Sequence, residues 1–412
     1  MRILLVQSFT PALAPIFPLG LASITSSLLP DHQVEICDPN IEEKGLEALK
    51  TAVREFQPDI IGLSLRNVDT GQSTEPISFI PGFVSTLKTI KTCIPNVLII
   101  AGGAGFSIFG RELMERFQEL DAGVFLEGET TVREILSHRD QLDKVKGIFL
   151  RSSGDVIFTG KNPFVDPNGL PIPYRGYHLP AYAKKCGEYA DSLYAVGVQS
   201  KRGCLYRCAH CTYPYLEGNS LRLRSPSKVV DEIEYLTTQN IDNLFIVDSV
   251  FNQPYDHALS ICEEIIRRRL DVSWSAYFRD DLLDERLMKR AEEAGCTLFE
   301  LSPDGLTDRA MKVLKKGLSI EEVLKTARLL AKSEGSSVVY NFLRNLPDED
   351  LQEKVRGRET IKRIVEICGE KMDGYHPNLS RIRVYPHTAI YELALQKKII
   401  SESTDLLHPV FL

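Results

Sequence analysis

Several features that define other protein classes are scarce in this sequence. The 412 residues include no apolar stretch of membrane-spanning length, and the opening MRILLVQSF has no cleavable secretory pattern. Only nine cysteines are present, so we expect a reducing, cytoplasmic setting in which thiols bind metal instead of forming disulfides. The formal net charge is −7, and the short basic clusters Arg267–Arg269 and Lys312–Lys316 lie in helical patterns. We expect these clusters to be solvated helix faces, with no nucleic-acid partner and no membrane span.

The first 145 residues alternate short apolar runs with amphipathic stretches. With 43% hydrophobic residues in all, the chain can bury a large core, which favours at least two domains. The apolar runs are ILLV (3–6), VEIC (34–37), IIGLSL (60–65), VLIIA (97–101) and GVFL (123–126). This α/β alternation predicts a doubly wound domain of the Rossmann-like or flavodoxin-like kind over residues 1–145. Its ligand would bind beyond the carboxyl ends of the strands, at loops 8–18, 64–73, 102–110 and 127–131.

The pattern changes near residue 145. KGIFLR and DVIFTG predict a hairpin, and the five prolines of NPFVDPNGLPIPYRGYHLP favour a linker, together spanning residues 146–190. A second alternation occupies residues 191–390, with runs LYAVGV (193–198), LFIVD (244–248), VSWSAYF (272–278), TLFELS (297–302), SVVYNFL (337–343) and SRIRVY (380–385). Six such units predict a partial (β/α)6 barrel of the TIM type, with its active site at the carboxyl ends of the strands. Residues 391–412 form a carboxyl-terminal segment whose apolar end is compatible with a natural chain that continues past Leu412.

Three cysteines lie together in SKRGCLYRCAHCTYP (200–214), directly after the first predicted barrel strand. The spacing Cys204-x3-Cys208-x2-Cys211 is suited to zinc or an iron–sulfur cluster. A structural zinc site normally has four ligands, and no fourth cysteine is near; His210 adjoins Cys211 and is expected to point away. Three thiolates on a four-iron cube leave one iron open for a small chelating molecule that receives an electron. The remaining cysteines of this half are expected in the core: Cys262, Cys296 and Cys368.

This cysteine motif, placed after the first strand of a partial barrel, resembles the radical S-adenosylmethionine (SAM) enzymes over residues 190–390. The resemblance implies that the three cysteines hold a [4Fe–4S] cluster, that SAM binds its open iron, and that an external donor such as flavodoxin or ferredoxin reduces it. The SAM contacts that it implies are Tyr213, Asp248, Arg279, Glu300 and Ser302, with Arg279 pairing with the SAM carboxylate. The residues alone leave Asp248 open as a turn cap, and Arg279 as an ion pair with Asp280 or Asp281. DSVFN (248–252) departs from the Gly-Gly-Glu segment usual in the family.

The first half resembles the cobalamin-binding domain that precedes the barrel in many radical SAM proteins. Four phrases carry the likeness: FPLGLASITSSLL (17–29), PDIIGLSLRN (58–67), AGGAGFS (101–107) and LEGETT (126–131). Small residues there would let backbone amides approach the nucleotide tail. The contacts that the resemblance implies are Ser64, Leu65, Arg66, Asn67, Gly102, Gly103, Gly105, Phe106, Glu127, Gly128 and Glu129.

The lower face of the cobalt is a separate question. Many cobalamin domains supply a histidine from an Asp-x-His-x-x-Gly loop after the first strand, whereas residues 7–18 read QSFTPALAPIFP. His32 lies in a turn, where a histidine is usually just solvated, so we expect no protein histidine ligand. Arg66 cannot donate electrons to cobalt and would disfavour lower axial ligation if it lay beneath the corrin. Pairing of Arg66 with Asp69, or with corrin amides only, is the alternative.

Together the resemblances imply a cobalamin-dependent radical SAM C-methyltransferase, which methylates an unactivated carbon through a 5′-deoxyadenosyl radical and methylcobalamin. The same architecture serves cyclases and ring-rearranging or oxidising enzymes without methyl transfer, and a non-catalytic corrinoid and cluster sensor is a third reading. A methylthiotransferase needs three further amino-terminal cysteines, where only Cys37 and Cys93 are available. We expect a small-molecule or peptide substrate, whose identity the sequence leaves open. Its predicted pocket comprises polar residues near the last two strands, which are otherwise routine barrel-mouth residues: Tyr340, Asn341, Arg344, Arg383, Tyr385 and His387.

Overall fold

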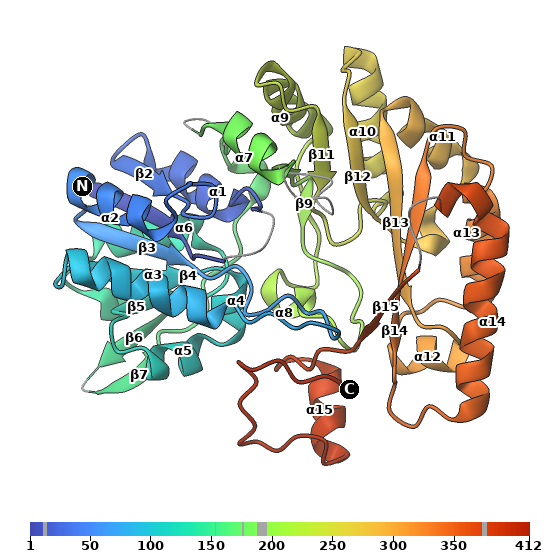
Figure 1. Ribbon diagram of the computed structural model, residues 1–412. Helices are drawn as coiled ribbons and strands as arrows, with labels where there is room; N and C mark the ends of the chain where they lie inside the picture. Colours follow the sequence, from blue (N-terminus) through green and yellow to red (C-terminus); the bar gives the residue numbers. More distant parts are fainter. Residues whose placement is uncertain (11–14, 153, 175–176, 188–195, 373–376) are drawn as a thin grey trace. The chain divides into compact units, whose positions relative to one another are not determined.

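The computed structural model describes the chain except residues 11–14, 153, 175–176, 188–195 and 373–376. It forms two compact units (Figure 1): Met1–Thr70 with Pro76–Leu193, and Gly71–Glu75 with Tyr194–Leu412. The segment expected to be a hairpin and linker, 146–190, clusters with the first unit. Within it, the Tyr182 hydroxyl donates a hydrogen bond to Asp38 Oδ2 (3.1 Å), and the ring of Tyr174 lies 5.6 Å from that of Phe17.

The first unit is built on a seven-stranded sheet with the order β2-β1-β3-β4-β5-β6-β7. The first five strands are parallel, and β6 and β7 add to the edge as an antiparallel hairpin. The order of the parallel strands is that of a flavodoxin-like doubly wound sheet, as predicted. The strands are β1 (Arg2–Gln7), β2 (Gln33–Cys37), β3 (Ile60–Ser64), β4 (Leu98–Gly102), β5 (Ala122–Val124), β6 (Ile148–Ser152) and β7 (Asp155–Phe158).

Helices pack on the first sheet in pairs. Ile3 and Leu5 of β1 share a core cluster with Leu21 of α1 and with Val132 and Ile135 of α6, because alternate strand residues face the same side. Helix α2 packs on α3. The predicted hairpin forms β6 and β7, which belong to this sheet. The helices are α1 (Leu19–Leu28), α2 (Leu46–Phe56), α3 (Ile80–Cys93), α4 (Ala104–Ile108), α5 (Gly110–Arg116), α6 (Gly128–Ser137) and α7 (Leu179–Cys186), with 3-10 turns η1 (Leu142–Lys144) and η2 (Pro167–Gly169).

The second unit contains six parallel strands in the order β15-β14-β13-β12-β11-β8. This open parallel series is the predicted partial barrel; residues 193–195 of its first predicted run lie outside the described residues. Side chains alternate between a helix-covered face and the opposite face. The strands are β8 (Val196–Val198), β11 (Asn243–Ile246), β12 (Ser273–Phe278), β13 (Cys296–Asp304), β14 (Ser337–Arg344) and β15 (Asn378–Arg381).

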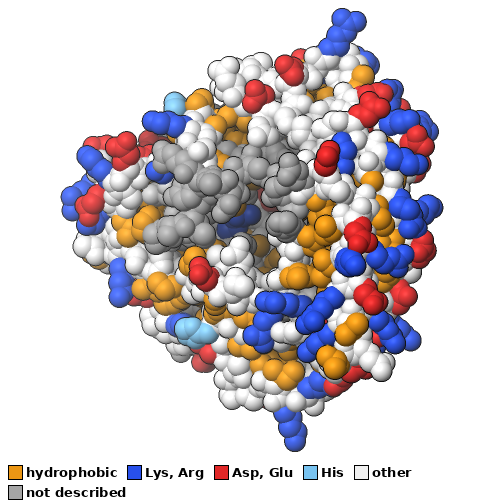
Figure 2. All heavy atoms as spheres, turned by 45° about the vertical axis from the view of Figure 1, so that its right-hand side comes forward, with side chains coloured by type: hydrophobic (Ala, Val, Ile, Leu, Met, Phe, Trp, Pro, Cys, Tyr) orange, Lys and Arg blue, Asp and Glu red, His pale blue; other side chains and the backbone are white. Residues whose placement is uncertain are grey.

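Helices α10, α11, α13 and α14 lie along the outer side of this sheet (Figure 1). Acidic and basic side chains are intermixed over the right-hand part of the face in Figure 2. Among the described residues, no helix combines the length and apolar composition that a membrane span needs. The elements are β9 (Lys201–Arg202), α8 (Tyr213–Leu216), β10 (Arg222–Leu223), α9 (Pro226–Thr238), α10 (Tyr255–Arg268), η3 (Asp280–Leu282), α11 (Glu285–Glu293), α12 (Asp308–Val313), α13 (Ile320–Leu330), α14 (Leu351–Cys368), η4 (Gly369–Met372) and α15 (Ala389–Gln396).

Candidate functional site

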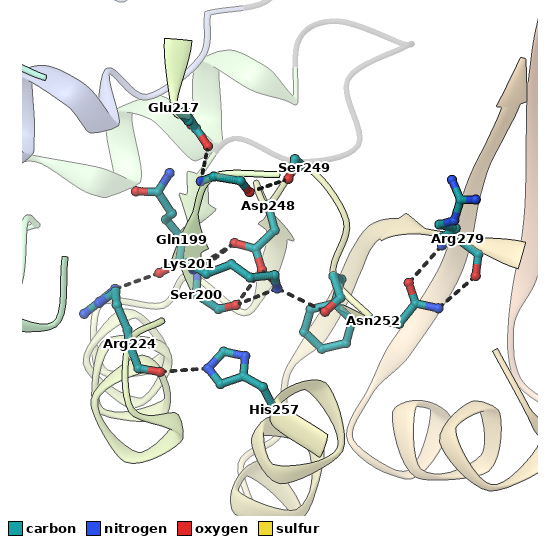
Figure 3. Close-up of polar contacts among 12 residues, drawn as sticks. Gln199, Ser200, Lys201, Glu217, Arg224, Asp248, Ser249, Asn252, His257 and Arg279 are labelled. Atoms are coloured by element: carbon teal, nitrogen blue, oxygen red, sulfur yellow. Dashed lines mark hydrogen bonds and ion pairs between the residues drawn. The ribbon is translucent and has the colours of Figure 1, made fainter. Parts of the chain in front are cut away.

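The cysteine loop leaves the carboxyl edge of the second sheet after β8 and β9, and its entry is fixed at Gly203. The Gly203 amide donates to Glu217 Oε2 (2.9 Å), and the Ser249 hydroxyl donates to the Gly203 carbonyl (3.0 Å), as Figure 3 shows. Gly203 has φ +93°, and a Cβ there would lie 2.0 Å from the carbonyl oxygen of Ser220. Only glycine fits this position, which starts the loop one residue before Cys204.

The middle of the loop is fixed at Ala209, between the second and third cysteines. Its amide donates to the Leu314 carbonyl (2.8 Å), and its carbonyl accepts from the Ile390 amide (2.9 Å). Ala209 also belongs to the apolar cluster that contains Ile382 and Val384. The end of α12 and the start of α15 therefore hold the loop from two sides.

The thiols themselves are withdrawn from solvent. Cys204 is buried, and Cys208 and Cys211 are partly buried. Burial raises the pKa of the Cys208 thiol and raises that of Cys211 to about 12, so thiolates here depend on bound metal. Within the described residues, no three His, Cys, Asp or Glu side chains converge as they would around a single ion. A cubane spreads its thiolates over three irons, so three spaced thiols on one fixed loop fit that group.

A buried ion pair lies at the base of the same loop (Figure 3). The Lys201 ammonium is 2.7 Å from Asp248 Oδ2, and Asp248 also accepts hydrogen bonds from the Ser200 amide (2.8 Å) and the Lys201 amide (3.2 Å). The ammonium also donates to the Phe251 carbonyl (3.0 Å). Asp248 thus ties the loop's first residues to the end of β11. This anchoring role is close to the capping alternative, and a contact of Asp248 with SAM stays a prediction.

Arg279 makes the ion pair that the sequence left open. Its Nε is 2.6 Å from Asp281 Oδ1, and its NH2 group donates to the Lys316 carbonyl (2.7 Å). The guanidinium lies 3.8 Å from the ring centroid of Tyr206, and its backbone pairs with Asn252. Arg279 therefore supports the cysteine loop through Tyr206, while its pairing with a SAM carboxylate stays a prediction.

Lys316 is a residue that the sequence analysis missed. It was expected on a solvated helix face, but only 9% of it is exposed, and its ammonium lies 2.7 Å from Asp304 Oδ2. Burial lowers the pKa of Lys316, but Asp304 and Cys208 outweigh it, so the net pKa is raised and the lysine stays protonated. Gly317, with φ +62°, was the available signal, because a glycine just beyond a helix pattern marks its end. The solvated face is confirmed at Arg267, whose side chain is 68% exposed, whereas the neighbouring Arg268 is largely buried by its pairs with Asp231 and Glu234.

His210 faces the same carboxylate, with its Nε2 atom 3.5 Å from Asp304 Oδ2. Burial lowers the pKa of its imidazole. The imidazole is thus directed at an acidic side chain, and the expectation that it points away from the cysteines stays a prediction.

Polar side chains alternate along the face of β13 that the helices do not cover. Glu300 accepts from the Ser275 hydroxyl (3.2 Å), and Ser302 accepts from the Asn341 side-chain amide (3.3 Å). Burial raises the pKa of Glu300. The structure therefore brings Glu300, Ser302 and Asn341 onto one polar surface, and Tyr213 lies 38% exposed at the start of α8.

Two of the predicted substrate residues have structural roles instead. Tyr340 is 0% exposed, and its pKa is raised by burial and by charges that include Cys368 of α14, so it lies on the helix-covered face. Arg383 is buried and donates to the Leu406 carbonyl (2.6 Å), and its guanidinium lies 4.6 Å from the Tyr385 ring centroid. Arg344 is exposed at the end of β14, and the His387 ring stacks on Tyr215 at 4.1 Å.

In the first unit, two glycines bring the loop after β4 against the loop after β3. A Cβ on Gly103, whose φ is +102°, would lie 2.6 Å from the Leu65 carbonyl oxygen, and one on Gly105 would lie 2.8 Å from Asn67. The Gly105 amide donates to the Arg66 carbonyl (2.8 Å). These glycines therefore serve loop packing, and their expected role at the nucleotide tail stays a prediction. Arg66 and Asn67 are exposed at the carboxyl edge.

Other members of the predicted cobalamin set are used internally. Phe106 is fully buried over Gly123, where a Cβ would meet its ring at 2.0 Å, and Leu65 is 0% exposed. Glu129 accepts from the Ser23 hydroxyl (2.8 Å), which joins α6 to α1, and Glu127 accepts from the Val165 amide (2.6 Å). Gly102 ends β4, and a Cβ on Gly128 would lie 2.8 Å from Ile24.

Polar residues lie at the carboxyl edge of the first sheet on both sides of β1. The Ser8 amide donates to the Ser64 carbonyl (3.1 Å), and Asn40 accepts from the Thr10 amide (2.6 Å). Residues 11–14 of the predicted loop lie outside the described residues. His32 immediately precedes β2 and thus lies at the amino edge of the sheet, opposite the ligand-binding edge. The expectation that His32 does not bind cobalt stays a prediction.

Known proteins share both units. Residues 11–136 match the B12 binding domain, and residues 198–356 match the Radical SAM superfamily. "Uncharacterized methyltransferase PH0819" of Pyrococcus horikoshii is 25% identical over 387 residues, covering 93% of this chain and 79% of that protein. The anaerobic magnesium-protoporphyrin IX monomethyl ester cyclase of Synechocystis sp. is 25% identical over 419 residues, covering 97% and 78%.

Among solved structures, the fold is similar to that of the radical SAM methyltransferase TsrM from Kitasatospora setae, with tryptophan and a SAM analogue bound. The TM-score is 0.80 at 22% identity, over 100% of this chain and 80% of that chain. The cysteine loop described above lies within the matched radical SAM region, and the loops at the edge of the first sheet lie within the matched B12 region. The chain therefore belongs to the cobalamin-dependent radical SAM family, with a B12 binding domain ahead of a radical SAM barrel.

Proposed function

We propose that the protein is a C-methyltransferase that transfers a methyl group to an unactivated carbon of a small molecule or peptide. The observation that carries the proposal is the three-thiol loop, fixed at Gly203 and Ala209, at the carboxyl edge of the barrel sheet. The other cysteines of this unit are buried away from it in the core, as predicted: Cys262, Cys296 and Cys368. Three cysteines would hold a [4Fe–4S] cluster and leave one iron for SAM.

The bound cofactors supply a radical able to remove hydrogen from carbon and a methyl group for transfer. The chain's own residues hold and orient them. Cys204, Cys208 and Cys211 provide the thiolates, and the polar surface of Glu300 and Ser302 offers acceptors for the hydroxyl and amino groups of SAM. In the first unit, Arg66 and Asn67 present polar side chains at the edge where a corrin binds, with no histidine assigned to the metal.

Three similar proteins bear on the reaction. PH0819 and TsrM are both named methyltransferases, and both match nearly the whole chain. The magnesium-protoporphyrin cyclase matches as much of it, which makes ring formation or oxidation without methyl transfer the second candidate. A non-catalytic sensor is the third candidate. A sensor does not need an iron left open for SAM, so the three-cysteine loop does not favour it.

Product analysis separates these candidates. The anaerobically purified chain would be reconstituted with iron, sulfide and hydroxocobalamin, and bound iron and corrinoid would be quantified. With dithionite and SAM carrying a deuterated methyl group, a methyltransferase forms 5′-deoxyadenosine and S-adenosylhomocysteine, and an accepted substrate gains the labelled methyl. A cyclase or oxidising enzyme forms 5′-deoxyadenosine without labelled product. A sensor forms no 5′-deoxyadenosine, and that result would remove the proposal.

A further inference from the structure

Lys316 is a buried cation of the second unit, and its contacts lead to the cysteine loop. Its side chain is withdrawn from water, so its charge is weakly screened by salt. A buried lysine normally requires a partner, and Asp304, itself 7% exposed, supplies one at 2.7 Å. Both ends of the residue are fixed, because the Lys316 carbonyl accepts from Arg279 (2.7 Å).

Two contacts bring this ion pair to the cysteine loop. The Ala209 amide donates to the Leu314 carbonyl two residues before Lys316 (2.8 Å). His210, between Cys208 and Cys211 in the chain, lies 3.5 Å from the same Asp304 oxygen that binds the lysine. The Asp304 carboxylate therefore lies between the Lys316 ammonium and the loop that carries the thiols.

Both charges of the ion pair act on Cys208. Burial raises the pKa of that thiol, Lys316 lowers it and Asp304 raises it. For Cys211, burial and the two neighbouring thiols raise the pKa, whereas a hydrogen bond with the Tyr213 backbone and the Lys316 charge lower it. These directions agree with the contacts at Ala209 and His210, which bring the ion pair to the cysteine loop. The second cation nearby, Arg279, is offset by Asp281 at 2.6 Å.

We propose that Lys316 sets the reduction potential of the cluster held by Cys204, Cys208 and Cys211, by stabilising its more negative, reduced form. This inference rests on the proposed function, because it requires the cluster. The step is the gain of one electron from a low-potential donor, with no bond made or broken. Net charge around an iron–sulfur cluster is an established determinant of its potential, and a weakly screened charge acts strongly.

The test is a redox titration of the reconstituted holoprotein without SAM, with the reduced cluster followed by electron paramagnetic resonance. Lys316→Met should disfavour reduction about tenfold, which for one electron is a midpoint lower by about 59 mV. Lys316→Arg keeps the charge and should stay near the wild-type midpoint. Lys312→Met removes an exposed cation four residues earlier, in α12, and should leave the midpoint unchanged.

Asp304→Asn is the complementary variant, because it leaves the lysine charge uncompensated and should raise the midpoint. A wild-type midpoint in Lys316→Met with a full cluster overturns the inference. If Lys316→Met fails to assemble a cluster, an unchanged or lower midpoint in Asp304→Asn overturns it. Failure of the wild-type chain to assemble any cluster would instead count against the proposed function.

Discussion

Lys201 and Asp248 form an ion pair that is almost completely buried, with side chains 1% and 0% exposed and 2.7 Å between nitrogen and oxygen. The pair joins the strand end before the cysteine loop to the strand end of β11, 47 residues further along the chain. Because neither charge reaches water, each depends on the other. Any change at this pair acts directly on the start of the loop.

Removing one partner should therefore be costly. Asp248→Ala leaves a buried, unpaired ammonium and is expected to lower the free energy of unfolding by about 3–5 kcal/mol, measured by urea denaturation. Cluster content after reconstitution should fall with it. The matched control is Lys289→Ala, which breaks a pair of the same 2.7 Å length between side chains 61% and 65% exposed. That surface pair is expected to contribute little to stability, because water and salt screen its charges. Equal losses in the two variants would contradict the anchoring role.

Substitution of Gly203 tests whether the start of the cysteine loop must lie close to the backbone of Ser220. Gly203→Ala adds a Cβ 2.0 Å from the Ser220 carbonyl oxygen at φ +93°, so the loop must shift and cluster content should fall steeply. Gly160→Ala is the control, because Gly160 has φ +95° and nothing within 4 Å of the added Cβ. It should cost only the strain of the positive φ, about 1–2 kcal/mol. Iron and sulfide analysis of both variants would decide, and normal cluster content in Gly203→Ala would refute the argument.

Burial of Asp280 predicts a pH dependence of stability. Burial is the largest cause that raises the pKa of its carboxyl to about 7 in the folded protein, whereas an unfolded aspartate titrates near pH 4. The folded state holds the proton longer, so this group's stabilising contribution is complete at low pH and is lost as pH rises through about 7. Asp280→Asn cannot ionise, so its stability relative to wild type should rise by about 1.4 kcal/mol per pH unit between roughly pH 4 and 7, then level off.

Denaturant unfolding at pH 5, 6, 7 and 8 measures this difference. Exposed Asp271→Asn controls for the loss of one carboxylate from the chain. A difference between Asp280→Asn and wild type that stays constant from pH 5 to 8 would show that Asp280 does not titrate as its burial requires.

The sequence predicted the elements better than the residue roles within them. Parallel strands are largely buried, so apolar runs such as ILLV (3–6) in the first sheet and LFIVD (244–248) in the second identify strands of both sheets. The direction of one side chain near a strand end depends on register, which is why Tyr340 falls on the helix-covered face while its neighbour Asn341 does not. The burial of Lys316 depends on Asp304, twelve residues away on another element, and no local pattern contains that partner.

The Arg66 side chain provides a test confined to the first unit. It is exposed at the carboxyl edge of β3, so Arg66→Ala should change stability by no more than about 0.5 kcal/mol. If it lies beneath the corrin, the variant will keep its cluster content but change the cobalt ligation seen in the spectrum of the cob(II)alamin form. Arg66→Lys keeps the charge, and Arg54→Ala removes an exposed arginine from α2 as the control. An unchanged cobalt spectrum in Arg66→Ala would rule out a position of Arg66 beneath the corrin. Pairing with Asp69, or contact with corrin amides only, would then remain.

Replacement of one loop cysteine should separate the two cofactors. Cys208→Ala removes one of three thiolates, and a cubane with two remaining protein ligands is expected to be lost, together with 5′-deoxyadenosine formation. Corrinoid binding should persist, because its residues lie in the B12 binding region of the chain. Cys262→Ala is the control: this thiol is 0% exposed in α10, so it should cost stability through a small cavity while cluster content stays at the wild-type level. Full cluster absorbance and SAM cleavage in Cys208→Ala would disprove the assignment of the three thiols as ligands.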